Sequence, residues 1–343
     1  MGREAANERC LEVPMDAQDS SETQALPDAA ARRRKVSWIG LVESAGLLGI
    51  LATVATLFGA AHWLPELTTH FRVQLAVALG VLAIGALSAR RGILTALLAA
   101  AAGFHAVPVF LAARPTPPAA PAGPRVRLVS LNVHTANRAF GRVLDYLRQE
   151  DPDLILLLEV DAHWMRELAI LTNGYPTLVA DVREDNFGIA LFSRRPLTAP
   201  EVVMLEGSEV PSIIAGIALG ERRLQLLGTH PVPPASPDGA RERDAQLLSI
   251  GRWAAEHRGA AVVLGDLNVT PWSPVFHALL REGRLRRPHP GWGIVATWQL
   301  QNPLISLPLD HCLVSPGIAV TRLTVGPEVG SDHRPLSVEL AWE

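Results

Sequence analysis

Residues 261–268 read AVVLGDLN, an apolar run that ends in a carboxylate and an amide. The run Ala261–Leu264 is short and is followed by a glycine, so it predicts a buried strand. Alternate side chains of an extended chain point the same way, and Asp266 and Asn268 would therefore share one face where the strand ends. Gly265 allows close approach to the backbone. The stretch predicts a strand that presents two polar groups at the rim of a sheet.

Three similar apolar runs occur earlier in residues 125–343 and predict three more buried strands: Val126–Val129, Leu154–Leu158 and Leu224–Leu227. A polar side chain closely follows each run: Asn132, Glu159 and His230. Strand ends from one rim can converge on a single cleft, so residues that are far apart in the sequence can form one site.

Two polar segments near the C-terminus extend this set: Leu309-Asp310-His311 and Ser331-Asp332-His333. The second precedes a predicted last strand, Leu336–Trp342. Hydrolysis of a phosphoric ester needs a divalent ion, a base that prepares water, and donors for the charge that develops on oxygen. The combination of acids, amides and imidazoles therefore indicates a metal-assisted phosphoesterase.

In this order, the segments resemble those of the endonuclease/exonuclease/phosphatase superfamily. The resemblance covers residues 125–343, and its most specific pieces are Gly265–Asn268 and Ser331–Arg334. It implies an α/β (α+β) fold in which the catalytic domain is a four-layer αββα sandwich. It also implies an enzyme, a phosphatase or phosphodiesterase that hydrolyses phosphoric esters by metal-assisted attack of water.

The resemblance implies catalytic roles for five residues. Asp266 would orient or deprotonate the attacking water, and Asn268 would donate to the oxyanion of the transition state. His230 would bond the scissile phosphate or assist the leaving group. Asp310 would pair with His333 and favour its charged form, so that His333 contacts the phosphate.

Metal and substrate contacts complete the expected site. Glu159 is the best candidate ligand, because a carboxylate next to a buried strand needs a partner. By resemblance Asn132 would assist at the metal and the phosphate, although its spacing alone suits a turn residue equally well. Asp332 would be a further ligand or an orienting group, and Asn186 would touch the substrate. Oxygen ligands suit Mg²⁺, and Mn²⁺ would satisfy the same set, while zinc at the histidines is the competing interpretation.

Three apolar stretches precede the catalytic region: Ser44–Leu64, Val73–Ala89 and Ile93–Ala113. Their lengths are close to the ~20 residues of a membrane-spanning helix. We therefore expect a membrane domain with about three transmembrane helices over residues 37–113. The polar residues 1–36 would form a disordered cytoplasmic tail, and the Pro-rich residues 114–124 an extended linker.

Basic residues predict the orientation in the cytoplasmic membrane. Arg32–Lys35 precedes the first stretch and Arg90-Arg91 separates the second from the third, so both belong on the cytoplasmic side. With three spans the catalytic domain would lie outside the cytoplasm. If the middle stretch does not insert, the inference reverses.

Charge bears on the substrate. Residues 125–343 contain 21 Arg, no Lys and 25 Asp or Glu, a formal net charge of −4, whereas nucleic-acid-binding surfaces usually carry a cationic excess. The chain is also similar to three-span bacterial members that act on polyprenyl pyrophosphate carriers and affect glycopeptide resistance. A phosphorylated lipid is therefore the expected substrate, met at high effective concentration in the bilayer.

Two alternatives stay open: a membrane-tethered nuclease that acts on DNA, and a non-catalytic binding module. The full set of site residues argues against the second, and no protein partner is inferred. Two further features have two interpretations each. Arg243 and Gln246 share a helix face and would either orient the His230 loop or be solvated, and Trp272, Trp292 and Trp298 would either contact substrate or pack under loops.

Overall fold

The computed structural model describes residues 37–116, 121–257, 259–288, 293–294, 296–298 and 305–343. The predicted tail, residues 1–36, therefore lies outside the described residues. The described chain begins with four helices: α1 (Trp38–Thr56), α2 (Trp63–His70), α3 (Arg72–Ser88) and α4 (Gly92–Ala112). Strand β1 already begins at Ala122, inside the segment predicted as a linker.

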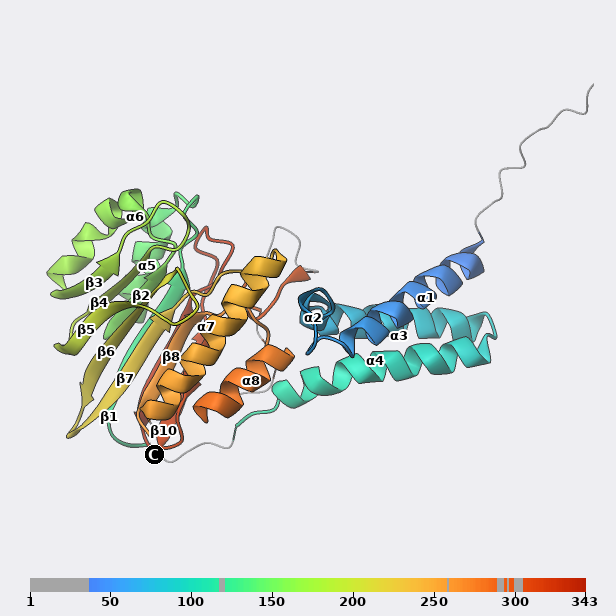
Figure 1. Ribbon diagram of the computed structural model, residues 1–343. Helices are drawn as coiled ribbons and strands as arrows, with labels where there is room; N and C mark the ends of the chain where they lie inside the picture. Colours follow the sequence, from blue (N-terminus) through green and yellow to red (C-terminus); the bar gives the residue numbers. More distant parts are fainter. Residues whose placement is uncertain (1–36, 117–120, 258, 289–292, 295, 299–304) are drawn as a thin grey trace, which may run out of the picture. The chain divides into compact units, whose positions relative to one another are not determined.

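Two β-sheets follow (Figure 1). The first has the order β10-β11-β1-β2-β4-β3, with the bounds β1 Ala122–Asn132, β2 Leu154–Leu158, β3 Thr177–Asp181, β4 Ile189–Ser193, β10 Ile318–Val325 and β11 Leu336–Trp342. The second has the order β5-β6-β7-β8-β9, with the bounds β5 Leu197–Met204, β6 Pro211–Leu219, β7 Arg222–Thr229, β8 Ala261–Asp266 and β9 Asp310–Val314. The predicted strands Leu154–Leu158 and Leu336–Trp342 have the observed bounds.

Helices cover the outer face of each sheet. On the first sheet these are α5 (Phe140–Glu150) and α6 (Ala162–Glu167), which continues into the 3-10 helix η1 (Leu168–Asn173). On the second they are α7 (Pro237–Glu256) and α8 (Pro274–Gly283). Both α7 and α8 start at a proline after a serine cap, Ser236 and Ser273, whose hydroxyls accept backbone N–H groups of the first turn.

The alternation of side chains in each strand explains the layers. In β2, Leu154, Leu156 and Leu158 pack in the core between the sheets, while Ile155 and Leu157 pack under α5 and α6. In β8, Val262 and Leu264 belong to the central core. Val263 packs against α7 and α8 instead. Because successive side chains point to opposite faces, the apolar strands build three cores at once, and the predicted four-layer αββα sandwich is confirmed.

The strand register brings the polar strand ends together. β1 pairs in parallel with β2, with Asn132 opposite Leu158, so that Asn132 and Glu159 are neighbours at one rim. β7 pairs in parallel with β8 and β8 pairs antiparallel with β9, where Asp266 is opposite Asp310. Pairing within the sheets therefore places Asn132 beside Glu159 and Asp266 beside Asp310, and the two pairs meet across the sheets, where Nδ2 of Asn132 lies 3.5 Å from Asp266.

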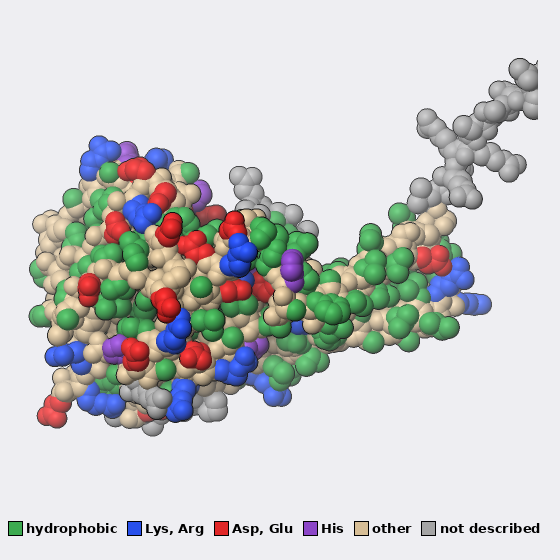
Figure 2. All heavy atoms as spheres, in the orientation of Figure 1, with side chains coloured by type: hydrophobic (Ala, Val, Ile, Leu, Met, Phe, Trp, Pro, Cys, Tyr) green, Lys and Arg blue, Asp and Glu red, His purple; other side chains and the backbone are tan. Residues whose placement is uncertain are grey.

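The N-terminal helices are strongly apolar. α1 and α4 are long and apolar enough to cross a membrane, and α2 and α3, bent by 71°, together pass the same test. Large apolar side chains point outward from the bundle, including Leu48 (67% exposed), Ile84 (67%) and Ile93 (82%). Figure 2 shows these helices covered with hydrophobic side chains.

The predicted bounds of the first apolar helix were wrong. The expected stretch was Ser44–Leu64, but α1 ends at Thr56, a turn follows, and α2 begins at Trp63. Pro65 explains the break, since proline has no N–H group and its ring clashes inside a helix but is tolerated in a first turn. The bounds of α3 and α4 agree with the other two predicted stretches to within one residue.

Candidate active site

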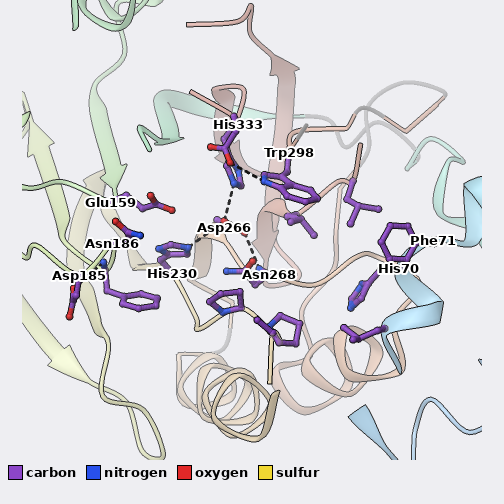
Figure 3. A pocket seen from close by; sticks show the side chains of 18 residues that line it. His70, Phe71, Glu159, Asp185, Asn186, His230, Asp266, Asn268, Trp298 and His333 are labelled. Carbon is purple, nitrogen blue, oxygen red and sulfur yellow. Dashed lines mark hydrogen bonds and ion pairs between the residues drawn. The ribbon is translucent and has the colours of Figure 1, made fainter. Parts of the chain in front are cut away.

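The polar strand ends line one cavity of about 540 Å³ (Figure 3). Seven of the nine predicted site residues contribute to its wall: Glu159, Asn186, His230, Asp266, Asn268, Asp332 and His333. The other two lie directly behind it, because Asn132 bonds Glu159 and Asp310 bonds His333. The structure thus brings all nine together.

Asp266 lies at the centre of the site and is only 1% exposed. Its carboxylate is 3.4 Å from Nε2 of His230 and 3.4 Å from Nε2 of His333, and it accepts a 2.9 Å hydrogen bond from the backbone N–H of Asn268. Burial alone would raise the pKa of Asp266, but the charge of His333 and the contact with His230 hold it at about 2. Asp266 is therefore a carboxylate at neutral pH.

His333 is held between two carboxylates. Its Nδ1 is 2.8 Å from Oδ2 of Asp310, whose backbone N–H donates to Oγ1 of Thr297. Burial lowers the pKa of His333, but the charges of Asp310 and Asp266 raise it to about 10. At neutral pH the ring is therefore an imidazolium, with one N–H on Asp310 and the other toward Asp266.

His230 closes the other side of Asp266. Burial lowers the pKa of His230, but the hydrogen bond and charge of Asp266 outweigh this effect and raise it above the ordinary value. Behind the ring, Nε2 of Gln246 donates to Oγ1 of Thr229, the residue before His230. Gln246 is fully buried, so the interpretation that its side chain is solvated is wrong.

A second acidic group lies at the end of β1 and β2. Nδ2 of Asn132 donates to Oε1 of Glu159 at 2.8 Å and approaches Asp266 at 3.5 Å. Nδ1 of His134 is 3.7 Å from Glu159 and 3.5 Å from Asp332. Sequence reasoning missed His134, although it follows Asn132 by two residues and shares the loop after the first predicted strand.

The described residues suit a divalent cation. Potential ligand atoms of Asp266, Asp310 and His333 lie within 4.8 Å of one another, but the imidazolium of His333 has no free lone pair, so only the carboxylates of this group can bind a cation. Glu159 and Asp332 add carboxylates on the same cavity wall. Hard cations such as Mg²⁺ prefer oxygen ligands, and among the described residues His311 is not part of this group. The donor chemistry therefore favours an oxygen-liganded ion over zinc.

Strained backbone is concentrated at the site. His134, Glu159, Asn186 and Asn268 all have φ between 49° and 65°, the left-handed region that non-glycine residues rarely adopt. Each such residue costs roughly 1–3 kcal/mol, and such residues cluster at active sites because the surrounding structure over-determines them. Gly265 lies where two backbone segments approach most closely. A Cβ at this position would be 2.0 Å from the carbonyl oxygen of Thr229, so only glycine fits.

One wall of the cavity comes from outside the predicted catalytic region. Leu67, His70 and Phe71 of the α2 segment line it, which no sequence pattern indicated. Arg243 of α7 connects the α2 segment to the catalytic region, since it is 0% exposed and lies 3.1 Å from Glu66 of α2. Its Nη1 also donates to the backbone carbonyl of Asn268. Arg243 is therefore not solvated, contrary to one of the two interpretations of the sequence.

Two of the three tryptophans discussed in the sequence analysis lie in different environments. Nε1 of Trp298 donates to Asp332 at 3.1 Å, and its ring lines the cavity. Trp272, in the loop between β8 and α8, is buried. Trp292 lies outside the described residues.

Comparisons with known proteins agree with this geometry. The sequence profile of the Endonuclease/Exonuclease/phosphatase family matches residues 129–333, more than half of the chain. A search of curated protein sequences found no significant match.

Solved structures share the fold at low sequence identity. The 3′ phosphatase NExo from Neisseria, bound to a product DNA hairpin, superposes with a TM-score of 0.54 at 21% identity, over 63% of this chain and 100% of that one. The catalytic domain of human Nocturnin, bound to sulfate, gives 0.52 at 18% identity, over 65% and 97%. TDP2 from D. rerio, complexed with a single-stranded DNA product, gives 0.52 at 17%, over 63% and 98%. The matched profile and the two-sheet fold together show that the chain belongs to the endonuclease/exonuclease/phosphatase family of metal-dependent phosphoric ester hydrolases.

Proposed function

We propose that the chain is a membrane-anchored, Mg²⁺-dependent hydrolase that acts on a phosphorylated lipid, with a polyprenyl pyrophosphate as the best candidate. The observation that carries this proposal is the joining of a phosphoesterase site to a bundle of helices whose outer surface is apolar. Side chains such as Leu48 and Ile93 are exposed over long helices, which is unfavourable in water and expected in lipid.

A three-span topology is part of the proposal. α1, α3 and α4 would cross the membrane, and Arg90-Arg91 between α3 and α4 would lie on the cytoplasmic side. The segment between α1 and α3 would then lie on the opposite side of the membrane from Arg90-Arg91, together with the catalytic domain that follows α4. Contact between α2 and the catalytic domain through Glu66 and Arg243 supports this arrangement, since both must be on one side to meet.

The proposed chemistry uses the ionisation of the site. Glu159 and Asp332, with Asn132 beside them, would hold Mg²⁺, which neutralises phosphate oxygens when bound. Asp266, a buried carboxylate, orients the attacking water and accepts its proton as the oxygen bonds to phosphorus. The imidazolium of His333 stabilises the negative charge that develops on the phosphate oxygens.

Two residues complete the displacement. Nδ2 of Asn268 donates to the carbonyl of Pro231 at 2.8 Å, which leaves its second hydrogen for a phosphate oxygen. His230, with a raised pKa, can donate a proton to the leaving oxygen as its bond to phosphorus breaks. Water thus supplies the new oxygen of the released phosphate, and the polyprenyl monophosphate leaves with the proton donated by His230.

The proposal is tested with the purified full-length protein in detergent. We expect Mg²⁺-dependent release of phosphate from a polyprenyl pyrophosphate, loss of release with EDTA, and recovery on adding Mg²⁺. Supercoiled plasmid is assayed in the same preparation. Nicking without phosphate release would overturn the lipid substrate and favour a nuclease, an activity on DNA for which the structural neighbours provide the precedent.

The proposed metal ligand makes a separate prediction. Glu159→Gln should raise the Mg²⁺ concentration needed for half-maximal turnover by about 10-fold or more, because a neutral amide binds a hard cation more weakly. A titration of turnover against Mg²⁺ measures this shift. Glu201→Gln, at an exposed carboxylate on β5, is the matched control and should leave the titration unchanged. An unshifted curve for Glu159→Gln would exclude Glu159 as a ligand.

A further inference from the structure

The catalytic cavity has two chemically different walls. Acids and imidazoles from the strand ends form one. The other is apolar and includes Leu67 and Phe71 of the α2 segment, the loop residues Pro233 and Pro234, and Leu307. In Figure 3, His70 and Phe71 approach the cavity from the side opposite Glu159 and Asp185, with Asp266 between them.

The α2 wall is fixed by a buried polar network. Glu66 is 1% exposed and accepts hydrogen bonds from Arg243 at 3.1 Å and from Oγ of Ser273 at 2.6 Å. His70 contacts Glu66 and lies 3.0 Å from Oγ1 of Thr270. A buried charge without a partner is costly, so α2 cannot leave this position without exposing or stranding Glu66 and Arg243.

The same loop holds α2 and the catalytic amide. Thr270 and Ser273 follow Asn268 directly after β8, and Ser273 also caps α8 by accepting the backbone N–H of Val275. Arg243 joins the two parts, since it bonds both Glu66 and the carbonyl of Asn268. The apolar wall therefore has a fixed position relative to the residues that meet the phosphate.

The charge of the cavity restricts its occupant. Of the described residues that line it, none is Arg or Lys, and four are acidic: Glu159, Asp185, Asp266 and Asp332. A nucleic acid carries a phosphate at every nucleotide and would need cationic contacts along its path, whereas a pyrophosphate carries only two phosphates, both close to the proposed Mg²⁺ site. An apolar group attached to the phosphate, by contrast, fits a wall of leucine, phenylalanine and proline.

Resting on the proposed function, we infer that α2 is a substrate-binding element. Leu67 and Phe71, with Pro233 and Pro234 on the same wall, hold the hydrocarbon chain beyond its first isoprene unit, while the reacting phosphate lies against Asp266 and His333. α2 connects α1 to α3, the apolar helices proposed to cross the membrane, so the chain can pass from the bilayer to the site along α2. Each methylene buried there is worth roughly four-fold in affinity.

The test compares two substrates with the same reacting group and different chains. Turnover of a long-chain polyprenyl pyrophosphate and of a five-carbon isoprenyl pyrophosphate is measured for the full-length protein and for Leu67→Ser and Phe71→Ser. We expect kcat/KM for the long chain to fall by about 10-fold or more, mainly through KM, and kcat/KM for the short chain to stay within about two-fold. Leu64→Ser is the matched control, because Leu64 belongs to α2 and is exposed but does not line the cavity.

The outcomes separate this inference from the proposed function. If the unaltered protein hydrolyses the long-chain substrate and both variants do so equally well, α2 does not bind the chain, although the proposed function stands. Equal loss on both substrates would also overturn the inference, since it would indicate a role in positioning the catalytic residues. If the unaltered protein releases no phosphate from either substrate, the proposed function fails and the inference fails with it.

Discussion

Asp266→Asn is expected to reduce turnover by about 10²–10⁴-fold while the protein remains folded. The amide has the size of the carboxylate and can still accept the backbone N–H of Asn268, so the loop geometry is retained. It cannot accept a proton from water, and it removes the negative charge next to His230 and His333. His333 keeps Asp310 as its partner.

The measurement is kcat with the substrate that the unaltered protein hydrolyses, at saturating Mg²⁺. Asp145→Asn is the control, because Asp145 is an exposed carboxylate on α5 in a surface ion pair with Arg148, and its replacement should not change kcat. A melting temperature and an elution volume close to those of the unaltered protein establish folding. Turnover within two-fold of normal would show that Asp266 is not the group that handles the proton.

Much of this site follows from local patterns. The run Leu154–Leu158 has the length of a strand and a carboxylate directly after it, and alternation then dictates which leucines face which core. Polar groups that follow such runs are expected where a strand ends, although the spacing of Asn132 alone suits a turn residue equally well. The pattern predicted that strand ends could share one cleft, and the order of the segments, through the family resemblance, assigned residues as distant as Asn132 and His333 to one site.

The remaining features depend on tertiary pairing, which local patterns do not encode. Glu66 and Arg243 are 177 residues apart, and nothing near either one specifies the other as its partner. Arg243 has a polar position on a helix, which is compatible with a solvated face as well as with a buried ion pair. The contribution of α2 to the cavity was unpredictable for the same reason, and only Pro65 signals that a helix begins there.

The buried pair between α2 and α7 leads to the largest expected effect on stability. Glu66→Ala should lower the free energy of unfolding by about 3 kcal/mol, because it strands the guanidinium of Arg243, which is 0% exposed. The partly exposed Asp244 remains a partner for Arg243, which places the effect at the lower end of the range for broken buried pairs. For a domain of this size the loss corresponds to a melting temperature lower by roughly 6–12 °C.

Thermal unfolding in detergent measures this shift, and Glu43→Ala is the matched control. Glu43 also pairs with an arginine, Arg91, at 2.9 Å, but both side chains are about half exposed, so its loss should cost no more than ~1 kcal/mol.

The double variant Glu66→Leu/Arg243→Met removes both charges and should be more stable than Glu66→Ala alone, since no charge is then left buried without a partner. A melting temperature for Glu66→Ala equal to that of the control would mean that Arg243 finds water when Glu66 is absent, and hence that α2 is not tightly docked. If instead the double variant regains stability but still hydrolyses the long-chain substrate poorly, the ion pair serves to position α2 beside the catalytic loop rather than to stabilise the fold.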